Sequence, residues 1–143
     1  MILIKELSHN DADLCFQLDS STISLWNKKQ WENEFNKKGG NILGILFSEK
    51  IIGICSFSIV LDEAQINYFS VSTKFRRKGY GTLLMKHLIK KCELFNLKKL
   101  LLEVSEENKI AIEFYDKFDF LTVGFRKKFY IDGSNALLKE KYL

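Results

Sequence analysis

A short basic turn between two apolar segments is the part of this chain whose residue types and spacing best suit a chemical task. It runs from Arg76 to Gly81, follows a strand-like segment at 67–71, and leads directly into a segment with helical periodicity. Its two glycines let the backbone bend and approach a ligand closely, and the first N–H groups of a helix have no intrahelical acceptor. Because the helix dipole also favours an anion there, the turn predicts a phosphate site. The same turn also fits a strand that simply ends.

The charge of the protein allows several partners. Arg76, Arg77 and Lys78 add positive charge at the turn, and 22 Lys and Arg against 18 Asp and Glu give a net charge of +4. This charge suits an anionic cofactor, an acidic peptide or RNA, or solubility alone.

Metal and serine-type catalysis are hard to assemble from this composition. His9 and His87 are the only histidines, and neither has a second His or Cys at a metal-ligand spacing, so we expect no metal. The three cysteines, Cys15, Cys55 and Cys92, lie far apart in apolar surroundings and are expected to be reduced core thiols.

The length bounds the domain organisation. With 143 residues and 46% hydrophobic content, we expect residues 1–143 to form one domain. No apolar run is long enough to span a membrane, and the first residues lack the features of a signal peptide, so we expect a cytoplasmic protein.

Hydrophobic periodicity predicts the elements that must position the turn. Strands are expected at residues 1–7, 41–47, 51–60, 63–71, 97–104, 121–130 and 136–142, with a bulge at Gly53. Helices are expected at 10–20, 28–36, 80–95 and 108–118, the third with an apolar stripe of Leu83, Leu84, Leu88 and Cys92. This order is typical of a mixed α/β or α+β domain with one central sheet.

Three local patterns together resemble the GCN5-related N-acetyltransferase (GNAT) family. The family's Arg/Gln-x-x-Gly-x-Gly/Ala signature matches Arg76 to Gly81, between a strand and a helix as the family requires. The family's Asn-x-x-Ala-x-x-x-Tyr helix matches Asn108 to Tyr115, after a Leu-Glu-Val strand at 102–104. Together with segments 60–64 and 126–130, that strand resembles the bacterial branch that acetylates the alanine of a ribosomal protein.

The resemblance implies a single GNAT-like domain with a mixed, mostly antiparallel sheet of six to seven strands and about four helices. It implies transfer of an acetyl group from acetyl-CoA to an amine, with the N-terminal α-amine of a ribosomal protein as the leading acceptor. Two positions depart from the family: Asp119 stands where Gly is common, and Leu25 where Pro often precedes Trp26. Asp tolerates the left-handed conformation that Gly provides.

If the resemblance holds, acetyl-CoA is held mostly by backbone N–H groups. Those near 69–71 would bind the acetyl and pantetheine portions, and those at about 77–82 the pyrophosphate. The Asn108 side chain would add a hydrogen bond, although it can equally cap a helix. The cofactor contacts implied are Phe69, Ser70, Val71, Arg76, Arg77, Lys78, Gly79, Tyr80, Gly81, Thr82, Asn108 and Tyr115.

Two side chains are implied as catalytic. Tyr115 would give a proton to the departing thiolate, because a phenol is protonated at neutral pH; without its motif it reads as a packing tyrosine. Glu103 would take a proton from the amine through water, or would instead pair with a neighbouring lysine. An α-amine has a pKa of about 7.7 to 8.0, so a weak base is sufficient.

Aromatic side chains are the candidates for the acceptor groove. Trp26, Tyr68, Phe129 and Tyr130 are candidates, with Tyr130 foremost, because aromatic faces hold an extended peptide at little entropic cost. Several of them must be core residues, since aromatic residues make up 13% of the chain.

Two other functions stay open at this point. A small amine such as a polyamine or aminoglycoside would need a carboxylate-lined pocket, and the region near Trp26 offers only Glu32 and Glu34. A non-enzymatic RNA- or ribosome-binding module would use the basic runs at 76–78, 98–99 and 126–128.

Overall fold

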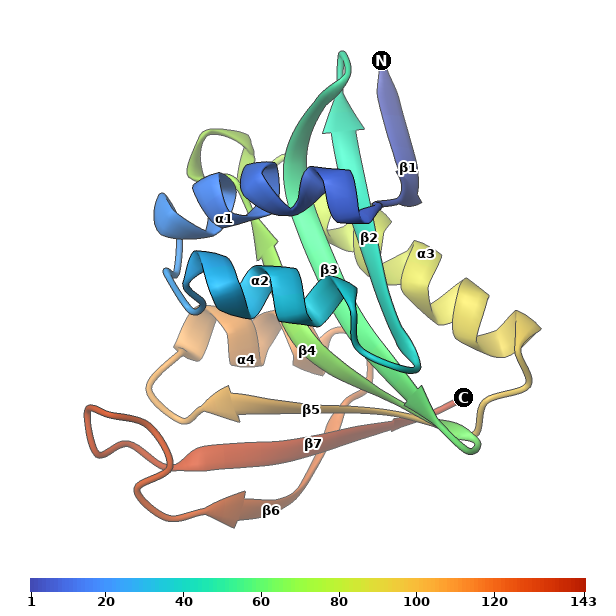
Figure 1. Ribbon diagram of the computed structural model, residues 1–143. Coiled ribbons are helices and arrows are strands. Elements are labelled where there is room, and N and C mark those ends of the chain that lie inside the picture. Colours follow the sequence, from blue (N-terminus) through green and yellow to red (C-terminus); the bar gives the residue numbers. More distant parts are fainter.

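The computed structural model describes residues 1–143 as one seven-stranded sheet between two layers of helices (Figure 1). The strands are β1 (Ile2–Glu6), β2 (Gly40–Phe47), β3 (Lys50–Val60), β4 (Glu63–Val71), β5 (Lys99–Ser105), β6 (Leu121–Arg126) and β7 (Ala136–Tyr142). The helices are α1 (Ala12–Ser20), α2 (Lys28–Phe35), α3 (Tyr80–Leu94) and α4 (Lys109–Asp116). The strand order is β1-β2-β3-β4-β5-β7-β6, and only β4 and β5 pair in parallel. The expected mixed, mostly antiparallel sheet with four helices is confirmed.

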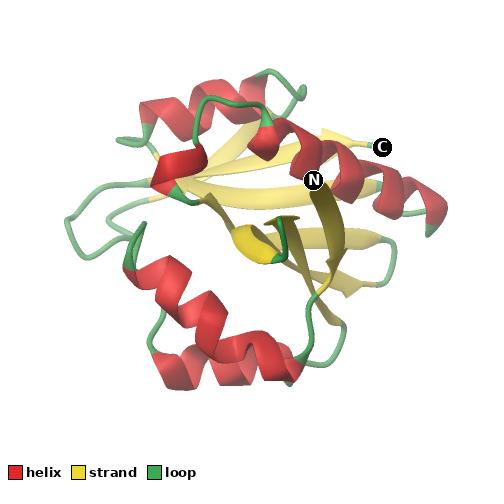
Figure 2. Ribbon diagram, turned by 90° about the horizontal axis from the view of Figure 1, so that it is seen from above, coloured by secondary structure: helices red, strands yellow, loops and turns green.

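Each face of the sheet has its own core. α1 and α2 pack on one face, and α3 and α4 on the other, so the sheet lies between two helix pairs (Figure 2). All three cysteines are free thiols buried in these cores, as expected. No helix has both the length and the apolar character that a membrane crossing requires.

Local sequence signals account for the helix starts and for one sharp turn. Asn27 and Gln30 form a reciprocal capping box at α2, in which Asn27 Oδ1 accepts from Gln30 N at 2.8 Å and Gln30 Oε1 accepts from Asn27 N at 2.9 Å. After α4, Asp119 adopts a φ of 65°, so it takes the left-handed conformation predicted for it in place of Gly.

Three details differ from the predictions. β6 ends at Arg126 rather than at residue 130, because the backbone turns into a loop whose Lys128 N–H donates to Asn135 Oδ1 at 2.9 Å. On α3, Leu83 is 45% exposed and Met85 takes its place in the core. The bulge expected at Gly53 lies at its neighbour Ile52, which has no partner on β2.

Candidate active site

The two parallel strands open a gap in the centre of the sheet. The β4–β5 ladder joins only residues 63–65 to residues 99–101, and Figure 1 shows the strands diverging from there. The second half of β4 therefore keeps its pairing with β3 and loses a partner on its other side. This opening leaves main-chain groups in the middle of a sheet free to bind a ligand.

The register of β3 and β4 decides which main-chain groups face the opening. Ser72 N donates to Ile52 O at 2.7 Å, and bonded and non-bonded pairs alternate along an antiparallel ladder. The N–H and C=O groups of Phe69 and Val71 therefore turn away from β3, toward the opening. Ser70 falls in a bonded pair with β3, which removes its N–H from the predicted cofactor contacts.

The turn after β4 presents a row of unpaired N–H groups. None of the backbone N–H groups of residues 77–82 donates a hydrogen bond within the protein. Arg77 and Gly79 both have positive φ angles, of 60° and 85°, so the backbone alternates in hand and curls its N–H groups into a concave nest. Because Gly79 also begins α3, the nest coincides with the positive end of a helix dipole.

Basic and aromatic side chains surround this nest. Arg76, Arg77 and Lys78 are all exposed, and Arg76 Nε donates to the outward-facing Val71 O at 3.0 Å. Half-buried Tyr80 packs near Phe75, with ring centroids 6.0 Å apart, and Thr82 is also half-buried in the first turn of α3. The predicted phosphate contacts are therefore brought together in one continuous turn.

α4 closes the other side of the opening. Asn108 caps it by accepting from Ala111 N at 3.2 Å through Oδ1, while its Nδ2 makes no hydrogen bond within the protein. Both interpretations of Asn108 are thus compatible, since the cap leaves the amide donors available. Phe114 packs between Gly81 and Phe69, and this contact joins α4 to the turn and to β4.

Tyr115 of α4 lies among aromatic rings and contacts β4 through Phe69. Its residue exposure is 8%, and its ring contacts those of Phe69, Phe114 and Phe120 at centroid separations of 6.5, 5.5 and 5.6 Å. The hydroxyl has no hydrogen-bond partner, yet it is not enclosed, so it keeps contact with solvent at the end of a buried ring. Burial raises the pKa of Tyr115 above its ordinary value, and the neighbouring Cys55 and Tyr130 raise it further.

Glu103 lies on the face of β5 that carries α1 and α2. Leu102 and Val104 point into the core under α3 and α4, so the alternation of the strand turns Glu103 to the face that carries α1 and α2. Its Oε1 lies 3.1 Å from Arg126 Nη2, so its partner is an arginine and not the lysine of the alternative interpretation.

Tyr130 lies in the β6–β7 loop, where its N–H donates to Ser134 O at 3.3 Å and its carbonyl oxygen accepts from Gly133 N at 2.9 Å. Burial raises the pKa of Tyr130, and the carboxylates of Glu103 and Asp132 raise it further. Tyr130 also acts on the pKa of Tyr115. Contacts link the same residues: Arg126, the ion-pair partner of Glu103, lies 5.5 Å from the centroid of the Phe129 ring, and the Phe129 and Tyr130 ring centroids lie 5.1 Å apart. Glu103 and Tyr130 therefore lie in one neighbourhood, and the effect of Tyr130 on the pKa of Tyr115 indicates that Tyr115 faces it.

Trp26 and Tyr68, two further predicted acceptor residues, belong to an aromatic cluster with Trp31 that joins the α1–α2 loop, α2 and β4. Trp26 packs on Trp31 and Tyr68 at centroid distances of 4.8 and 5.4 Å. Trp26 stays half-buried, but Tyr68 is only 2% exposed and its hydroxyl donates to Asp19. Tyr68 therefore supports this face from beneath rather than forming its surface, in contrast to our prediction.

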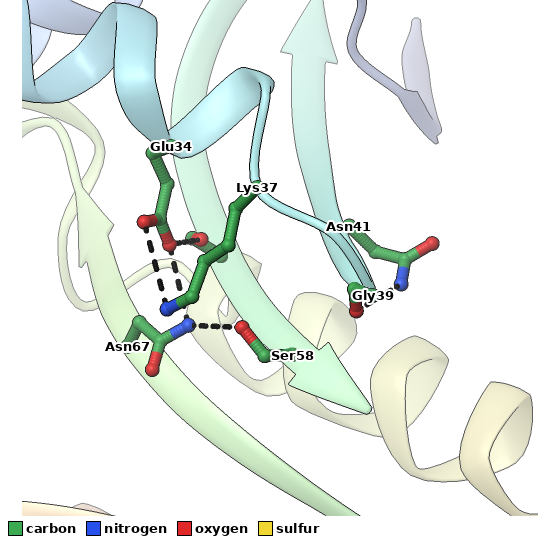
Figure 3. Close-up of polar contacts among 7 residues, drawn as sticks. Glu34, Lys37, Gly39, Asn41, Ser58 and Asn67 are labelled. Atoms are coloured by element: carbon green, nitrogen blue, oxygen red, sulfur yellow. Dashed lines mark hydrogen bonds and ion pairs between the residues drawn. The ribbon is translucent and has the colours of Figure 1, made fainter. Parts of the chain in front are cut away.

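Sequence reasoning missed the buried carboxylate of Asp19 on this face and the hydrogen-bond partners of Glu34. Asp19 is 0% exposed, and Glu34 binds Ser56 Oγ and Asn67 Nδ2 through one oxygen, as Figure 3 shows for Asn67. The signal for Asp19 was its position next to Leu18 on the apolar side of α1. Glu34 was named from the sequence as a candidate carboxylate, but nothing indicated its partners, because they lie 22 and 33 residues away.

The comparison with known families decides what this arrangement is. The family model described as "Acetyltransferase (GNAT) family" matches residues 8–120. The chain belongs to that family.

Individual relatives of this acetyltransferase point the same way. It is 28% identical over 148 residues to the ribosomal protein bS18-alanine N-acetyltransferase of Haemophilus ducreyi, covering 99% of this chain and 100% of the relative. It is also 28% identical over 133 residues to the Salmonella typhimurium enzyme of that name, covering 91% and 88%. The crystal structure of the Escherichia coli ribosomal-protein-S18-alanine N-acetyltransferase superposes with a TM-score of 0.93 at 24% identity, covering 99% and 94%, which shows the shared fold.

The geometry of this acetyltransferase fits acetyl-CoA, the acyl donor of the family. The nest at 77–82 offers unpaired N–H donors at a helix N-terminus, where the two phosphates of a pyrophosphate bind favourably. The outward-facing groups of Phe69 and Val71 provide the pairing edge of a strand, which suits the amides of a pantetheine arm. The donor therefore has two sets of unpaired main-chain groups available, one at the start of α3 and one on β4.

Proposed function

We propose that this acetyltransferase transfers the acetyl group of acetyl-CoA to the N-terminal α-amine of a protein, and that the protein is a ribosomal one. The observation that carries the proposal is the meeting of Glu103, Tyr115 and Tyr130 beside the opening between β4 and β5. The relatives from Haemophilus ducreyi and Salmonella typhimurium, both named for bS18, support the choice of acceptor.

In this proposal the enzyme holds the donor mainly through its backbone. The N–H groups of residues 77–82 bind the pyrophosphate, and the main-chain groups of Phe69 and Val71 bind the pantetheine and acetyl portions. Arg76, Arg77 and Lys78 compensate the phosphate charge, and the free amide of Asn108 donates a further hydrogen bond. Preformed donors aimed at the thioester oxygen stabilise the charge that develops there.

Tyr115 serves as the general acid. Its raised pKa keeps the phenol protonated throughout the physiological range, so the proton is available when the thiolate leaves. The hydroxyl has no competing partner in the protein, which leaves it free to turn toward the sulfur. A buried phenol with one accessible oxygen suits this role.

Glu103 serves as the general base for the acceptor amine, through a water molecule. It lies on the face with α1 and α2, from which the acceptor approaches, whereas the donor passes between β4 and β5 toward α3. An α-amine has a pKa of about 7.7 to 8.0, so a weak base such as a carboxylate paired with Arg126 is sufficient to accept its proton.

The acceptor peptide runs between the α1–α2 loop and the β6–β7 loop. Trp26 stands on the first loop, and Phe129 and Tyr130 stand on the second, so the three remaining aromatic candidates flank the same path. A ribosomal acceptor places this reaction in the cytoplasm, with residues 1–143 acting as one domain.

The small-amine alternative has less support. Glu34 is the carboxylate that a cationic amine would use, but Ser56 and Asn67 occupy one of its oxygens and Lys37 Nζ lies 3.9 Å from the other. A carboxylate already paired in this way offers little attraction to a second cation.

Thiol release from acetyl-CoA tests the proposal. The acceptors are a peptide that copies the N-terminus of bS18 from the same cell, the same peptide with a blocked α-amine, and a polyamine. We expect release with the free peptide only. Absence of release with every amine, while acetyl-CoA still binds, would rule out the catalytic assignment, and release with the polyamine alone would transfer it to small amines.

A further inference from the structure

Asp19 is a fully buried carboxylate that accepts four hydrogen bonds. Its Oδ1 accepts from Leu25 N at 2.9 Å and from the Tyr68 hydroxyl at 3.1 Å. Its Oδ2 accepts from Trp26 N at 2.9 Å and from Trp31 Nε1 at 3.0 Å. Every donor is neutral, so no cation compensates the buried charge. The four hydrogen bonds alone offset the free-energy cost of removing the carboxylate from water.

The four donors come from three different elements. Leu25 and Trp26 belong to the loop between α1 and α2, Trp31 lies on α2, and Tyr68 lies on β4. Asp19 itself lies in the last turn of α1, and its backbone carbonyl oxygen accepts from Ser24 N at 2.7 Å. Asp19 therefore binds three consecutive residues of the α1–α2 loop, and through Tyr68 it also connects this loop to β4.

A bulge in β4 makes this connection possible. Asn67 has no partner on β3, so Asn67 and Tyr68 both point to the face that carries α1 and α2. Tyr68 binds Asp19 of α1, and Asn67 binds Glu34 of α2 at 3.2 Å while also donating to Ser58 Oγ at 2.8 Å (Figure 3). Two consecutive residues of the donor strand thus hold one carboxylate from each acceptor-side helix.

The loop fixed in this way exposes apolar side chains. Ile23 is 49% exposed and Leu25 is 47% exposed, although the loop backbone around them is bound to Asp19. Ser24 between them has a φ of 51°, a strained conformation that the bonds to Asp19 retain.

We propose that Asp19 is a positioning residue for the acceptor, because it holds the α1–α2 loop in register with β4 so that Ile23, Leu25 and Trp26 meet the acceptor peptide. This inference rests on the proposed transfer to a peptide α-amine. It assigns to Asp19 an effect on the acceptor and none on the donor, since Phe69, Val71 and the nest at 77–82 do not contact it.

Asp19→Asn separates the two effects. An amide has one accepting oxygen, so in either orientation its NH₂ group faces two of the four donors. We expect the KM for the acceptor peptide to rise about tenfold or more, with the acetyl-CoA Kd within about twofold of wild type. The matched control is Asp13→Asn, which removes the same charge from an exposed position on the same helix, where it pairs only with Lys28 at 3.3 Å; both constants should stay unchanged.

Amide hydrogen exchange gives a readout that does not depend on catalysis. In Asp19→Asn, the Leu25 or Trp26 amide should exchange about tenfold faster or more, while the amides of β3 keep their protection. If the wild-type enzyme releases no thiol with any peptide, the proposed function fails, and the exchange result still decides whether Asp19 fixes the loop.

Trp31→Phe is the second test variant if Asp19→Asn does not fold. It removes the Trp31 Nε1 donor and leaves the Asp19 carboxylate in place. It should raise the acceptor KM by about threefold or more without changing the acetyl-CoA Kd. Equal changes in both constants, or no change in the acceptor KM of a folded variant, would overturn the assignment of Asp19.

Discussion

Glu103 and Arg126 form an ion pair across the strand that separates them, with Oε1 and Nη2 3.1 Å apart. β7 lies between β5 and β6, so the ion pair spans three strands on the face of the sheet that carries α1 and α2. Arg126 is the last residue of β6, and the loop that carries Tyr130 begins directly after it. The pair therefore fixes the candidate base and the start of the acceptor loop relative to each other.

Glu103→Gln should move the pH dependence of kcat/KM for the peptide to higher pH. Without the carboxylate, only acceptor amine that is already neutral reacts, and its fraction grows through the pKa of about 7.7 to 8.0 of an α-amine. Initial rates across this range provide the measurement. Arg126→Gln is the matched control, because it removes the partner and keeps the carboxylate. An unaltered profile in Glu103→Gln would point to a different base or to none.

Tyr115→Phe should lower kcat by about a hundredfold or more, the range expected for a lost general acid. The acetyl-CoA Kd, measured by calorimetry, should stay within about twofold, since the ring contacts remain. Tyr142→Phe, at a 64% exposed position of β7, controls for loss of a phenol elsewhere. A Tyr115→Phe enzyme with the wild-type rate would remove Tyr115 from the mechanism.

Gly81→Ala should separate stability from donor binding. A Cβ at this position would lie 3.6 Å from the Phe114 ring and 3.7 Å from Val71 Cγ2, which are ordinary contacts. Alanine in a helix is about 0.5 to 1 kcal/mol more favourable than glycine, so the Tm should not fall.

In the proposed function acetyl-CoA passes between Val71 and Phe114, and the added methyl group takes up part of that space. The acetyl-CoA Kd should therefore rise about tenfold or more. Gly124→Ala on β6, with its nearest contact to Leu138 at 3.4 Å, tests the substitution away from the opening. If Gly81→Ala binds acetyl-CoA as tightly as the wild type, the donor takes a different path.

Alkaline pH should destabilise the fold. Burial raises the pKa of Cys92 to about 11 and that of Cys15 to about 12, and it raises the pKa of Tyr68 and Tyr115 as well. A raised folded-state pKa means that the stability is fully present below the unfolded-state pKa and is lost as the pH rises toward the folded-state value.

The Tm should therefore decline from about pH 8.5, where unfolded thiols begin to ionise, and more steeply above about pH 10, where unfolded phenols do. Each group still protonated in the folded state costs about 1.4 kcal/mol per pH unit within its window. Thermal melts between neutral pH and about pH 10.5 measure this, and a constant Tm over that range would contradict the burial of these groups.

The elements were predictable because their causes are local. β4 begins and ends where the alternation placed it, Asn27 caps α2, and Asp119 takes the left-handed conformation that its turn requires. The errors arose where a distant contact decides the outcome. β6 is shortened by a loop that closes on Asn135, and Leu83 is exposed because α3 turns Met85 to the sheet.

The candidate site also has features with local causes and features that depend on distant contacts. The turn at 76–81 carries its own signal in glycines and charges, and the structure has a turn with unpaired N–H groups there; its binding of the donor stays a prediction. The Arg126 partner of Glu103, the bulge at Asn67 and the four donors around Asp19 depend on strand register and on contacts across tens of residues, which no spacing in the sequence reveals.

The position of the acetyl group on the product tests directly whether the enzyme acetylates the N-terminal α-amine of a ribosomal protein. Purified bS18 from the same cell, bearing both its free α-amine and its lysines, is incubated with the enzyme and acetyl-CoA, and the product is fragmented in a mass spectrometer. We expect one acetyl group, on the N-terminal α-amine, and none when Tyr115→Phe replaces the wild type for the same reaction time. Acetylation confined to lysine side chains, or none while a polyamine is acetylated, would contradict it.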